Sequence, residues 1–166
     1  MALSNGFYVA ITNNSIKPII KYEGIEVSPG HVTNIGIRRS FYYKQPSPYS
    51  SCRDSVESLT KSDSYYYTQT TKISRYTRNL CYEICFQYQY LIPICNCSDA
   101  SVESNENNVT VCFTDDERTC LDTQRTLFRS SNCNTDCPEA CERVEYQYKV
   151  SLSKYPSLWF AVFFLN

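Results

Sequence analysis

The residues best equipped for chemistry in this chain are its ten cysteines, nine of which fall between Cys81 and Cys141. Thiols can form disulfides, bind zinc or carry out redox exchange. Zinc sites and thioredoxin-like redox sites use pairs with two residues between the cysteines, whereas the close pairs here have three residues or one between them. The spacing therefore favours disulfides, and cysteine usage well above the cytosolic level predicts an oxidising compartment.

The spacing of the cysteines is roughly a mirror image. Cys81 and Cys85 are four positions apart at one end, and Cys133, Cys137 and Cys141 follow at steps of four at the other. Such a pattern suits two antiparallel segments joined by successive disulfides, in which the first cysteine of one segment pairs with the last cysteine of the other. Ten cysteines allow about 945 complete pairings, so the symmetry narrows the choice without fixing it. The favoured set is nested: Cys52–Cys141, Cys81–Cys137, Cys85–Cys133, Cys95–Cys120 and Cys97–Cys112.

Other signs of a chemical site are weak. The single histidine, His31, follows a Pro-Gly turn without a nucleophile or carboxylate beside it, so it is interpreted as a surface turn residue. Residues Asp115–Glu117 lack the alternating oxygen ligands of a calcium loop and are interpreted as a solvated charge run. The four glycines form no phosphate-binding loop, and a net charge of −1 offers no basic face to nucleic acid. We therefore expect no enzyme, no cofactor, no bound metal and no nucleic-acid partner.

Three glycosylation sequons agree with an oxidising compartment. They begin at Asn13, Asn96 and Asn108. Asn108 lies in a polar run and is the strongest candidate, whereas a bridged Cys97 beside Asn96 would crowd the transferase. We expect glycans on Asn13 and Asn108.

Two groups of strands are expected to frame the cysteine-rich region. Alternating apolar residues predict two strands from Gly6 to Ile20 around a polar tip at Asn13–Asn14, then a turn over Gly24–Gly30 and a strand over Val32–Tyr43. Residues Glu142–Ser153 alternate in the same way. They predict a strand that returns to the sheet formed by the opening strands.

Between the strands the apolar period becomes helical. From Ser74 onward apolar residues recur at steps of three and four, and Pro93 is expected to end this helix. A second, antiparallel helix is predicted over Leu121–Ser130. Pro138 forbids one continuous helix through the last three cysteines, so at least one bridge must lie on a turn.

The remaining segments carry weaker signals. Residues Arg53–Thr71 are polar and predict a surface loop, within which Tyr65–Tyr67 is expected to pack as a strand. Met1–Ala10 has no signal-peptide character, and no apolar run approaches the roughly 20 residues of a membrane-spanning helix. Leu158–Leu165 is apolar but only eight residues long, and it is expected to begin a short helix. These features suggest an extracellular piece without its targeting segment.

Several motifs follow one another in a fixed order along nearly the whole chain. They are Gly6-x-x-Val9-x-Ile11, Gly24-x-x-Val27-x-Pro29-Gly30, Pro46-Ser-Pro48-Tyr49 before Cys52, Tyr76 with the nine cysteines after it, and Tyr155-Pro156-Ser157. In this order they resemble the ectodomain of the degenerin, epithelial sodium channel and acid-sensing ion channel family.

The resemblance implies an α+β fold. An antiparallel palm sheet, from residues 1–51 and 142–157, would carry a helical thumb, residues 52–141, with the five nested disulfides. It also implies a subunit of an amiloride-sensitive, trimeric sodium channel in the plasma membrane, with this region on the extracellular side. Other channel subunits and the sodium ion are the implied partners, and the membrane would be reached through segments absent here.

The resemblance also assigns individual roles. Tyr49 matches the aromatic residue that couples the thumb to the first transmembrane helix, so it is the expected gating contact. Acid-sensing members carry many carboxylates between the cysteines that match Cys120 and Cys133, whereas this chain has Asp122, Arg125 and Arg129 there. This difference argues against a proton sensor at that place.

Two classes of function remain open at this stage. The first is the extracellular part of a sodium channel subunit that transmits gating motion to a pore, with a stimulus that the sequence leaves open. The second is a secreted cysteine-rich binding module of channel ancestry. The two differ in whether the complete protein is held in a membrane.

Overall fold

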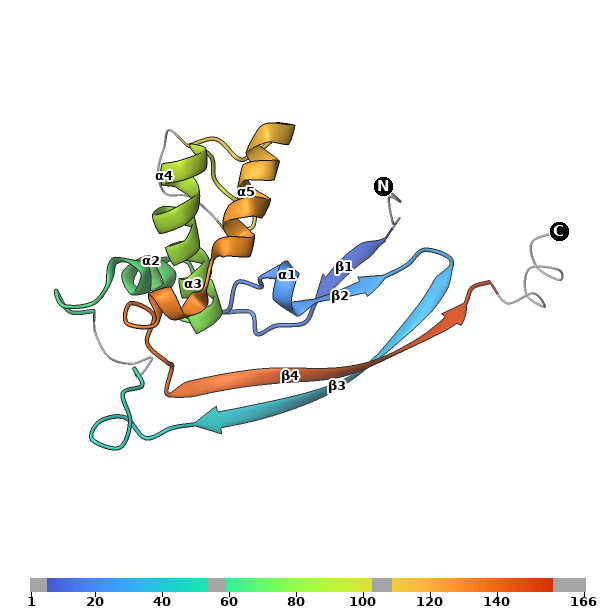
Figure 1. Ribbon diagram of the computed structural model, residues 1–166. Coiled ribbons are helices and arrows are strands. Elements are labelled where there is room, and N and C mark those ends of the chain that lie inside the picture. Colours follow the sequence, from blue (N-terminus) through green and yellow to red (C-terminus); the bar gives the residue numbers. More distant parts are fainter. Residues whose placement is uncertain (1–5, 54–58, 103–108, 157–166) are drawn as a thin grey trace. The chain divides into compact units, whose positions relative to one another are not determined.

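The computed structural model describes residues 6–53, 59–102 and 109–156, which combine helices with antiparallel strands in an α+β fold (Figure 1). The described residues divide into two compact units. One lies within 1–12, 18–42 and 144–166, and the other within 13–17 and 43–143. All ten cysteines belong to the second unit, which we call the helical unit, and the first is the strand unit.

The strand unit begins with a small antiparallel pair. Strand β1 (Phe7–Ala10) pairs with β2 (Gly24–Val27), and helix α1 (Ile20–Glu23) precedes β2 directly. The expected second strand ending at Ile20 is therefore wrong, and so is the expected turn over the whole of Gly24–Gly30. Ile20 begins the helical turn of α1 and is 43% exposed, whereas Ile19 before it is buried.

A second antiparallel ribbon joins β3 (His31–Tyr43) to β4 (Glu142–Lys154). Backbone hydrogen bonds join Lys44 to Cys141 beyond one end and Gly30 to Tyr155 beyond the other, in the same register at both ends. Both predicted strands are confirmed. The returning strand pairs with β3, however, and β1 and β2 form a separate two-stranded sheet.

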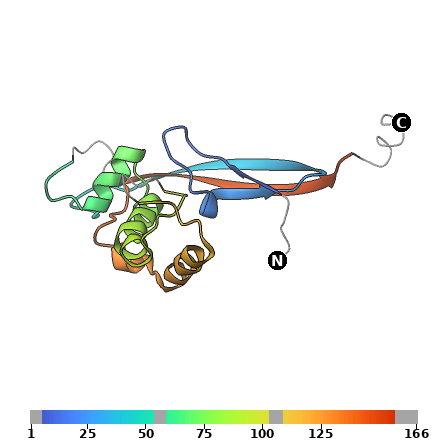
Figure 2. The same cartoon turned by 90° about the horizontal axis from the view of Figure 1, so that it is seen from above.

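The helical unit contains a nearly continuous helix and shorter helices around it. The elements are α2 (Tyr65–Ile73), α3 (Arg78–Phe86), the π-helical η1 (Gln87–Leu91), α4 (Ile92–Cys95), α5 (Asp115–Leu127) and the 3-10 turn η2 (Ser130–Cys133). Figures 1 and 2 both show α5 beside the helix formed by α3, η1 and α4.

Helix α2 corrects the expected surface loop. The Tyr65–Tyr67 segment is its first turn and not a strand. Ser64 caps the helix, because its hydroxyl accepts a hydrogen bond from the Tyr67 N–H at 3.1 Å. Tyr67 and Thr70 are buried, so packing selects a helix where composition alone favours a loop.

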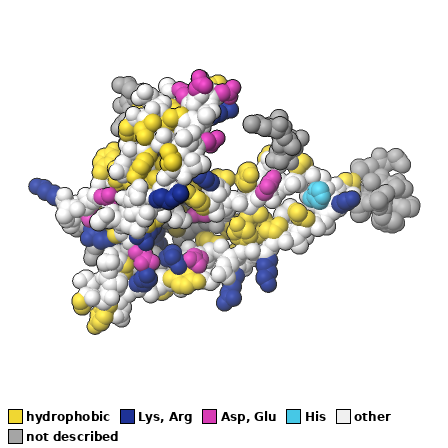
Figure 3. All heavy atoms as spheres, in the orientation of Figure 1, with side chains coloured by type: hydrophobic (Ala, Val, Ile, Leu, Met, Phe, Trp, Pro, Cys, Tyr) yellow, Lys and Arg dark blue, Asp and Glu magenta, His cyan; other side chains and the backbone are white. Residues whose placement is uncertain are grey.

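Two predicted helix boundaries also move. Pro93 does not end the long helix, because it lies in the first turn of α4, where its missing N–H is tolerated; the helix ends at Asn96, whose φ is 53°. Helix α5 begins at Asp115 and not at Leu121, because Thr114 and Glu117 form a capping box. Figure 3 shows acidic side chains gathered over this first turn, where they complement the helix dipole.

Five disulfides cross the helical unit. They join Cys52–Cys141, Cys81–Cys137, Cys85–Cys133, Cys95–Cys120 and Cys97–Cys112. These are the five nested pairs that the mirror-image spacing favours. The Cys137 N–H donates to the Cys133 carbonyl at 2.8 Å, so these two cysteines lie on one turn. The turn brings them close enough together to bridge Cys81 and Cys85, which are four positions apart on α3. It ends before Pro138, as the sequence predicts.

A partly buried ion triad holds α5 in addition to the Cys95–Cys120 bridge. Arg125 Nη1 lies 2.6 Å from Glu83 Oε2, and Arg125 Nη2 lies 2.7 Å from Asp99 Oδ2. The guanidinium also lies 3.8 Å from the centroid of the Phe86 ring. The Glu83 side chain is only 2% exposed, and no residue of α5 is buried. Arg125 is therefore the main polar anchor of this helix.

The charge state of Asp99 follows from its partners. Burial on its own would raise the pKa of this carboxyl, but hydrogen bonds from Ser101 and Arg125, with the charge of Arg125, outweigh that effect. The net result is a lowered pKa. Asp99 is thus stabilised in the ionised form that the triad needs.

Within the described ranges, no helix combines the length and the apolar character needed to cross a membrane. The expected short helix over Leu158–Leu165 lies outside the described residues, as does Asn108.

The first stability prediction concerns Gly24. A Cβ there would lie 2.4 Å from the Ile20 carbonyl oxygen, so we expect Gly24→Ala to destabilise the strand unit by about 1 to 3 kcal/mol. Gly36 is the matched control, because the nearest atom to its added Cβ is 3.9 Å away. Thermal unfolding should show a lower Tm for Gly24→Ala and an unchanged or slightly higher Tm for Gly36→Ala. Equal Tm changes for the two variants would contradict the close approach at Gly24.

A second prediction concerns Arg125. Changing Arg125 to Met removes its ion pair with the buried Glu83 carboxylate, so we expect a loss of about 3 to 5 kcal/mol of unfolding free energy. The double variant Arg125→Met/Glu83→Met should recover part of that loss. Arg118→Met is the control on the exposed side of α5 and should change stability by no more than about 0.5 kcal/mol. Denaturant unfolding measures all three, and equal losses for Arg118→Met and Arg125→Met would contradict the triad.

The lowered pKa of Asp99 predicts a pH dependence. A carboxyl whose pKa is lower in the folded state stabilises the fold above its unfolded pKa, about 4, and loses that contribution as the pH falls through the folded pKa. The natural chain should therefore have a higher unfolding free energy than Asp99→Asn at pH 6. This difference should become smaller as the pH falls through the folded-state pKa of Asp99. A difference that stays constant down to pH 2 would show that Asp99 is not held ionised.

Candidate functional site: the Tyr49 loop and its clamp

The expected gating residue lies at the tip of a short loop that we call the Tyr49 loop, residues 44–53. The Tyr49 N–H donates to the Pro46 carbonyl at 3.0 Å, and the Ser50 hydroxyl donates to the Gln45 carbonyl at 2.6 Å. These bonds form a tight turn within the helical unit. The Tyr49 side chain is 79% exposed, so the turn presents its ring at the surface.

Both ends of the Tyr49 loop are fixed to the same three residues, 139–141. At one end, the Lys44 N–H donates to the Cys141 carbonyl at 2.8 Å. At the other, the Arg53 N–H donates to the Glu139 carbonyl at 2.8 Å and its carbonyl accepts from the Cys141 N–H at 2.9 Å. The Cys52–Cys141 disulfide closes the clamp covalently.

An ion pair completes the clamp. Lys44 Nζ lies 2.6 Å from Glu139 Oε2, and this hydrogen bond lowers the pKa of the Glu139 carboxyl. Both side chains are exposed to solvent, so the pair adds little stability. The bridge contributes more, because Cys52 and Cys141 are 89 positions apart, and closing a loop of that length corresponds to about 4 to 5 kcal/mol in the chain-entropy treatment.

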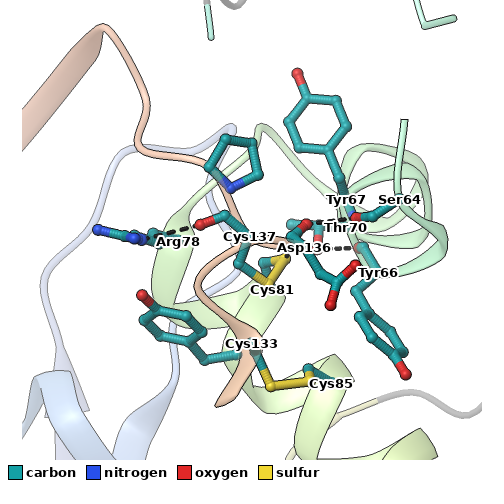
Figure 4. Close-up of a disulfide and its surroundings, with 12 residues drawn as sticks. Ser64, Tyr66, Tyr67, Thr70, Arg78, Cys81, Cys85, Cys133, Asp136 and Cys137 are labelled. Atoms are coloured by element: carbon teal, nitrogen blue, oxygen red, sulfur yellow. Dashed lines mark hydrogen bonds between the residues drawn. A yellow bond between two sulfur atoms is a disulfide. The ribbon is translucent and has the colours of Figure 1, made fainter. Parts of the chain in front are cut away.

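The segment that carries the clamp continues back to α3. Its residues Cys133 and Cys137 form disulfides with Cys85 and Cys81 on that helix, respectively, as Figure 4 shows. In addition, Arg78 Nε donates to the Cys137 carbonyl at 3.0 Å. The segment is therefore bound to α3 by side-chain hydrogen bonds as well as by sulfur.

Two hydroxyl groups bind the neighbouring carbonyls of this segment. The Ser64 hydroxyl donates to the Asp136 carbonyl, which attaches the start of α2 (Figure 4), and the Tyr76 hydroxyl donates to the Pro138 carbonyl. Burial raises the pKa of Tyr76, which keeps its hydroxyl protonated as a donor at neutral pH. Three consecutive carbonyls, at residues 136 to 138, are thus each held by a side chain.

One segment of the helical unit connects α2 and α3 with the Tyr49 loop. Residues 133–138 are bound to α2 and α3, and residues 139–141 hold both ends of the Tyr49 loop. The base of the Tyr49 loop and α3 are thus attached to one short stretch of chain. Among the described residues, no group of three His, Cys, Asp or Glu side chains is arranged to hold a metal ion.

The structure brings together some of the expected site residues and adds others. Tyr49 and the ten cysteines belong to the helical unit, as does Asn13, whereas Asn108 lies outside the described residues. Sequence reasoning did not identify Lys44 and Glu139 as clamp residues. They are 95 positions apart, and no local pattern signals a pairing across that distance.

Comparison with known proteins adds independent information. The sequence model of the family described as "Amiloride-sensitive sodium channel" matches residues 2–165. The chain is 25% identical to the mouse epithelial sodium channel subunit beta and 26% identical to the human beta subunit, in each case over 95% of this chain. It is 22% identical to the Xenopus laevis gamma subunit, also over 95% of this chain. The chain spans about a quarter of the length of these relatives.

The family match and the disulfide framework agree with each other. Disulfides of this density form and persist outside the cytosol, and the matched region lies on the extracellular side of the plasma membrane. The family is one of ion channels and not of enzymes. With the family match covering residues 2–165 and five nested disulfides formed by all ten cysteines, the chain belongs to the amiloride-sensitive sodium channel family.

Proposed function

We propose that this chain is the palm and thumb region of a sodium channel subunit and that it transmits gating motion to the pore through Tyr49. In this proposal residues 1–51 and 142–157 form the palm, and residues 52–141 form the thumb. The family match supports the channel assignment. The observation that carries the gating role is the exposed Tyr49 ring on a loop whose two ends share one clamp.

In the proposed mechanism, residues 133–141 carry motion from α3 to the Tyr49 loop. Motion of α3 passes through Cys81–Cys137 and Cys85–Cys133 into this segment and then into the base of the Tyr49 loop. The tip of the loop moves with its base, because the turn at Pro46–Ser50 is closed by its own hydrogen bonds. The Tyr49 ring offers an apolar face and a hydroxyl to the end of a transmembrane helix, where rings of this kind bind well.

The proposed partners follow from the same assignment. The complete protein would assemble with other channel subunits as a homo- or heterotrimer, conduct sodium ions, respond to amiloride-type blockers and reach the membrane through segments outside this chain. The matched relatives are themselves beta and gamma subunits, so assembly with unlike subunits is the favoured form.

Sodium current from the complete gene product tests the role of Tyr49. We expect Tyr49→Ala to reduce the amiloride-sensitive current several-fold at equal surface expression, because the loop loses its contact surface, while Tyr49→Trp retains most of it. Tyr43→Ala is the matched control, since Tyr43 is 71% exposed in the same unit but outside the loop, and it should leave the current unchanged.

Surface biotinylation must accompany the recordings, so that a loss of current is separated from a loss of protein at the membrane. An unchanged current in Tyr49→Ala would refute the coupling role while leaving the channel assignment intact. Recovery of the whole gene product from the medium as a soluble protein would instead favour the secreted binding module.

A further inference from the structure

We propose that Asn13 carries an N-linked glycan and that the first sugar of this glycan lies in a surface recess next to the sequon. The proposal depends on passage through the secretory pathway, which the disulfides support, and not on the proposed gating role. It concerns only residues of the helical unit.

The sequon forms a compact surface turn. The Ser15 N–H donates to Asn13 Oδ1 at 3.4 Å, and the Ile16 N–H donates to the Asn13 carbonyl at 3.0 Å. Asn14 and Ser15 are exposed. Asn13 itself is half-buried, and a glycan would be attached to the nitrogen of its side-chain amide.

A recess of about 270 Å³ adjoins this turn. Its lining consists of Asn14, Ser15, Ile16, Lys17, Ile73 and Ser74. The Arg75 N–H donates to the Ser15 carbonyl at 2.9 Å and so holds the turn against the end of α2. This hydrogen bond joins the two chain segments that line the recess.

The chemistry of the lining fits an N-acetylated sugar. N-acetylglucosamine has an apolar acetyl methyl group and ring C–H groups, together with hydroxyls and an amide. The lining includes two residues with apolar side chains, Ile16 and Ile73, beside residues with polar side chains such as Lys17, Ser74 and Asn14. A sugar attached to the adjacent Asn13 would be held there at a high effective concentration.

The attachment is a group transfer from a lipid diphosphate-linked oligosaccharide. The Asn13 amide nitrogen forms a bond to C1 of the first N-acetylglucosamine, and the bond between C1 and the diphosphate oxygen breaks. The lipid diphosphate leaves with the electron pair, and the amide nitrogen loses one proton. No oxidant or reductant is required.

The structure argues against the competing sequon at Asn96. Its hydroxyl residue, Ser98, is only 3% exposed and donates to the Thr110 carbonyl at 3.2 Å. The intervening Cys97 is bridged to Cys112, only 15 positions further on, so this bridge can close soon after the segment is synthesised. By contrast Arg75, which anchors the Asn13 turn, emerges long after the sequon itself.

The experiment uses the complete gene product expressed in animal cells, with peptide mass spectrometry after enzymatic deglycosylation in ¹⁸O water. We expect Asn13 to be occupied, and occupancy to be lost in Asn13→Gln and in Ser15→Ala. Ser15→Thr keeps the sequon and should retain the glycan, which separates loss of the acceptor from misfolding. An unoccupied Asn13 in the natural protein would overturn the proposal.

A second measurement tests the recess. Native protein should release the Asn13 glycan several-fold more slowly than denatured protein under the same glycosidase, because the first sugar is sheltered. Ile73→Ala should speed native release without changing occupancy, and Lys72→Ala is the control, since Lys72 is exposed on α2 and does not line the recess. Equal release rates for native and denatured protein would rule out a sheltered sugar.

Discussion

The structure depends on one constraint, the attachment of residues 133–141 to two distant parts of the chain. Nested disulfides fix this segment to α3 at Cys81 and Cys85 and to the Tyr49 loop at Cys52. Each bridge removes conformational freedom from the unfolded chain, and the outer ones close the longest loops. The bridges matter for this segment because it consists mainly of turns, and side-chain hydrogen bonds to the carbonyls of residues 136 to 138 add to them.

The bridges are needed because the apolar core of the helical unit is small. Its fully buried side chains include five cysteines beside a few large residues such as Leu80, Ile84 and Phe86. Helix α5 has no buried residue and is held by one bridge and by the triad around Arg125. Covalent links and ion pairs therefore hold this unit together in addition to its small apolar core.

The sequence predicted the features that follow from spacing and period. The mirror-image cysteines indicated the nested bridges, and the apolar periods indicated α3, β3 and β4. Helix α2 was missed because Ser, Tyr and Thr carry no helical apolar period, and only the burial of Tyr67 and Thr70 selects it. The clamp at Lys44 and Glu139 was missed because it joins residues far apart in sequence. The gating role of Tyr49 was predicted from the family resemblance and not from its own chemistry, and it stays a prediction.

The most direct test of this account is non-reducing peptide mapping of the secreted or membrane-extracted protein. The account predicts five cross-linked peptides, in which each cysteine of the first half of the series pairs with its mirror-image partner, from Cys52 with Cys141 inward to Cys97 with Cys112. Free thiols at these positions, or any crossed pair such as Cys81 with Cys133, would contradict the nested framework and the coupling of α3 to the Tyr49 loop that depends on it.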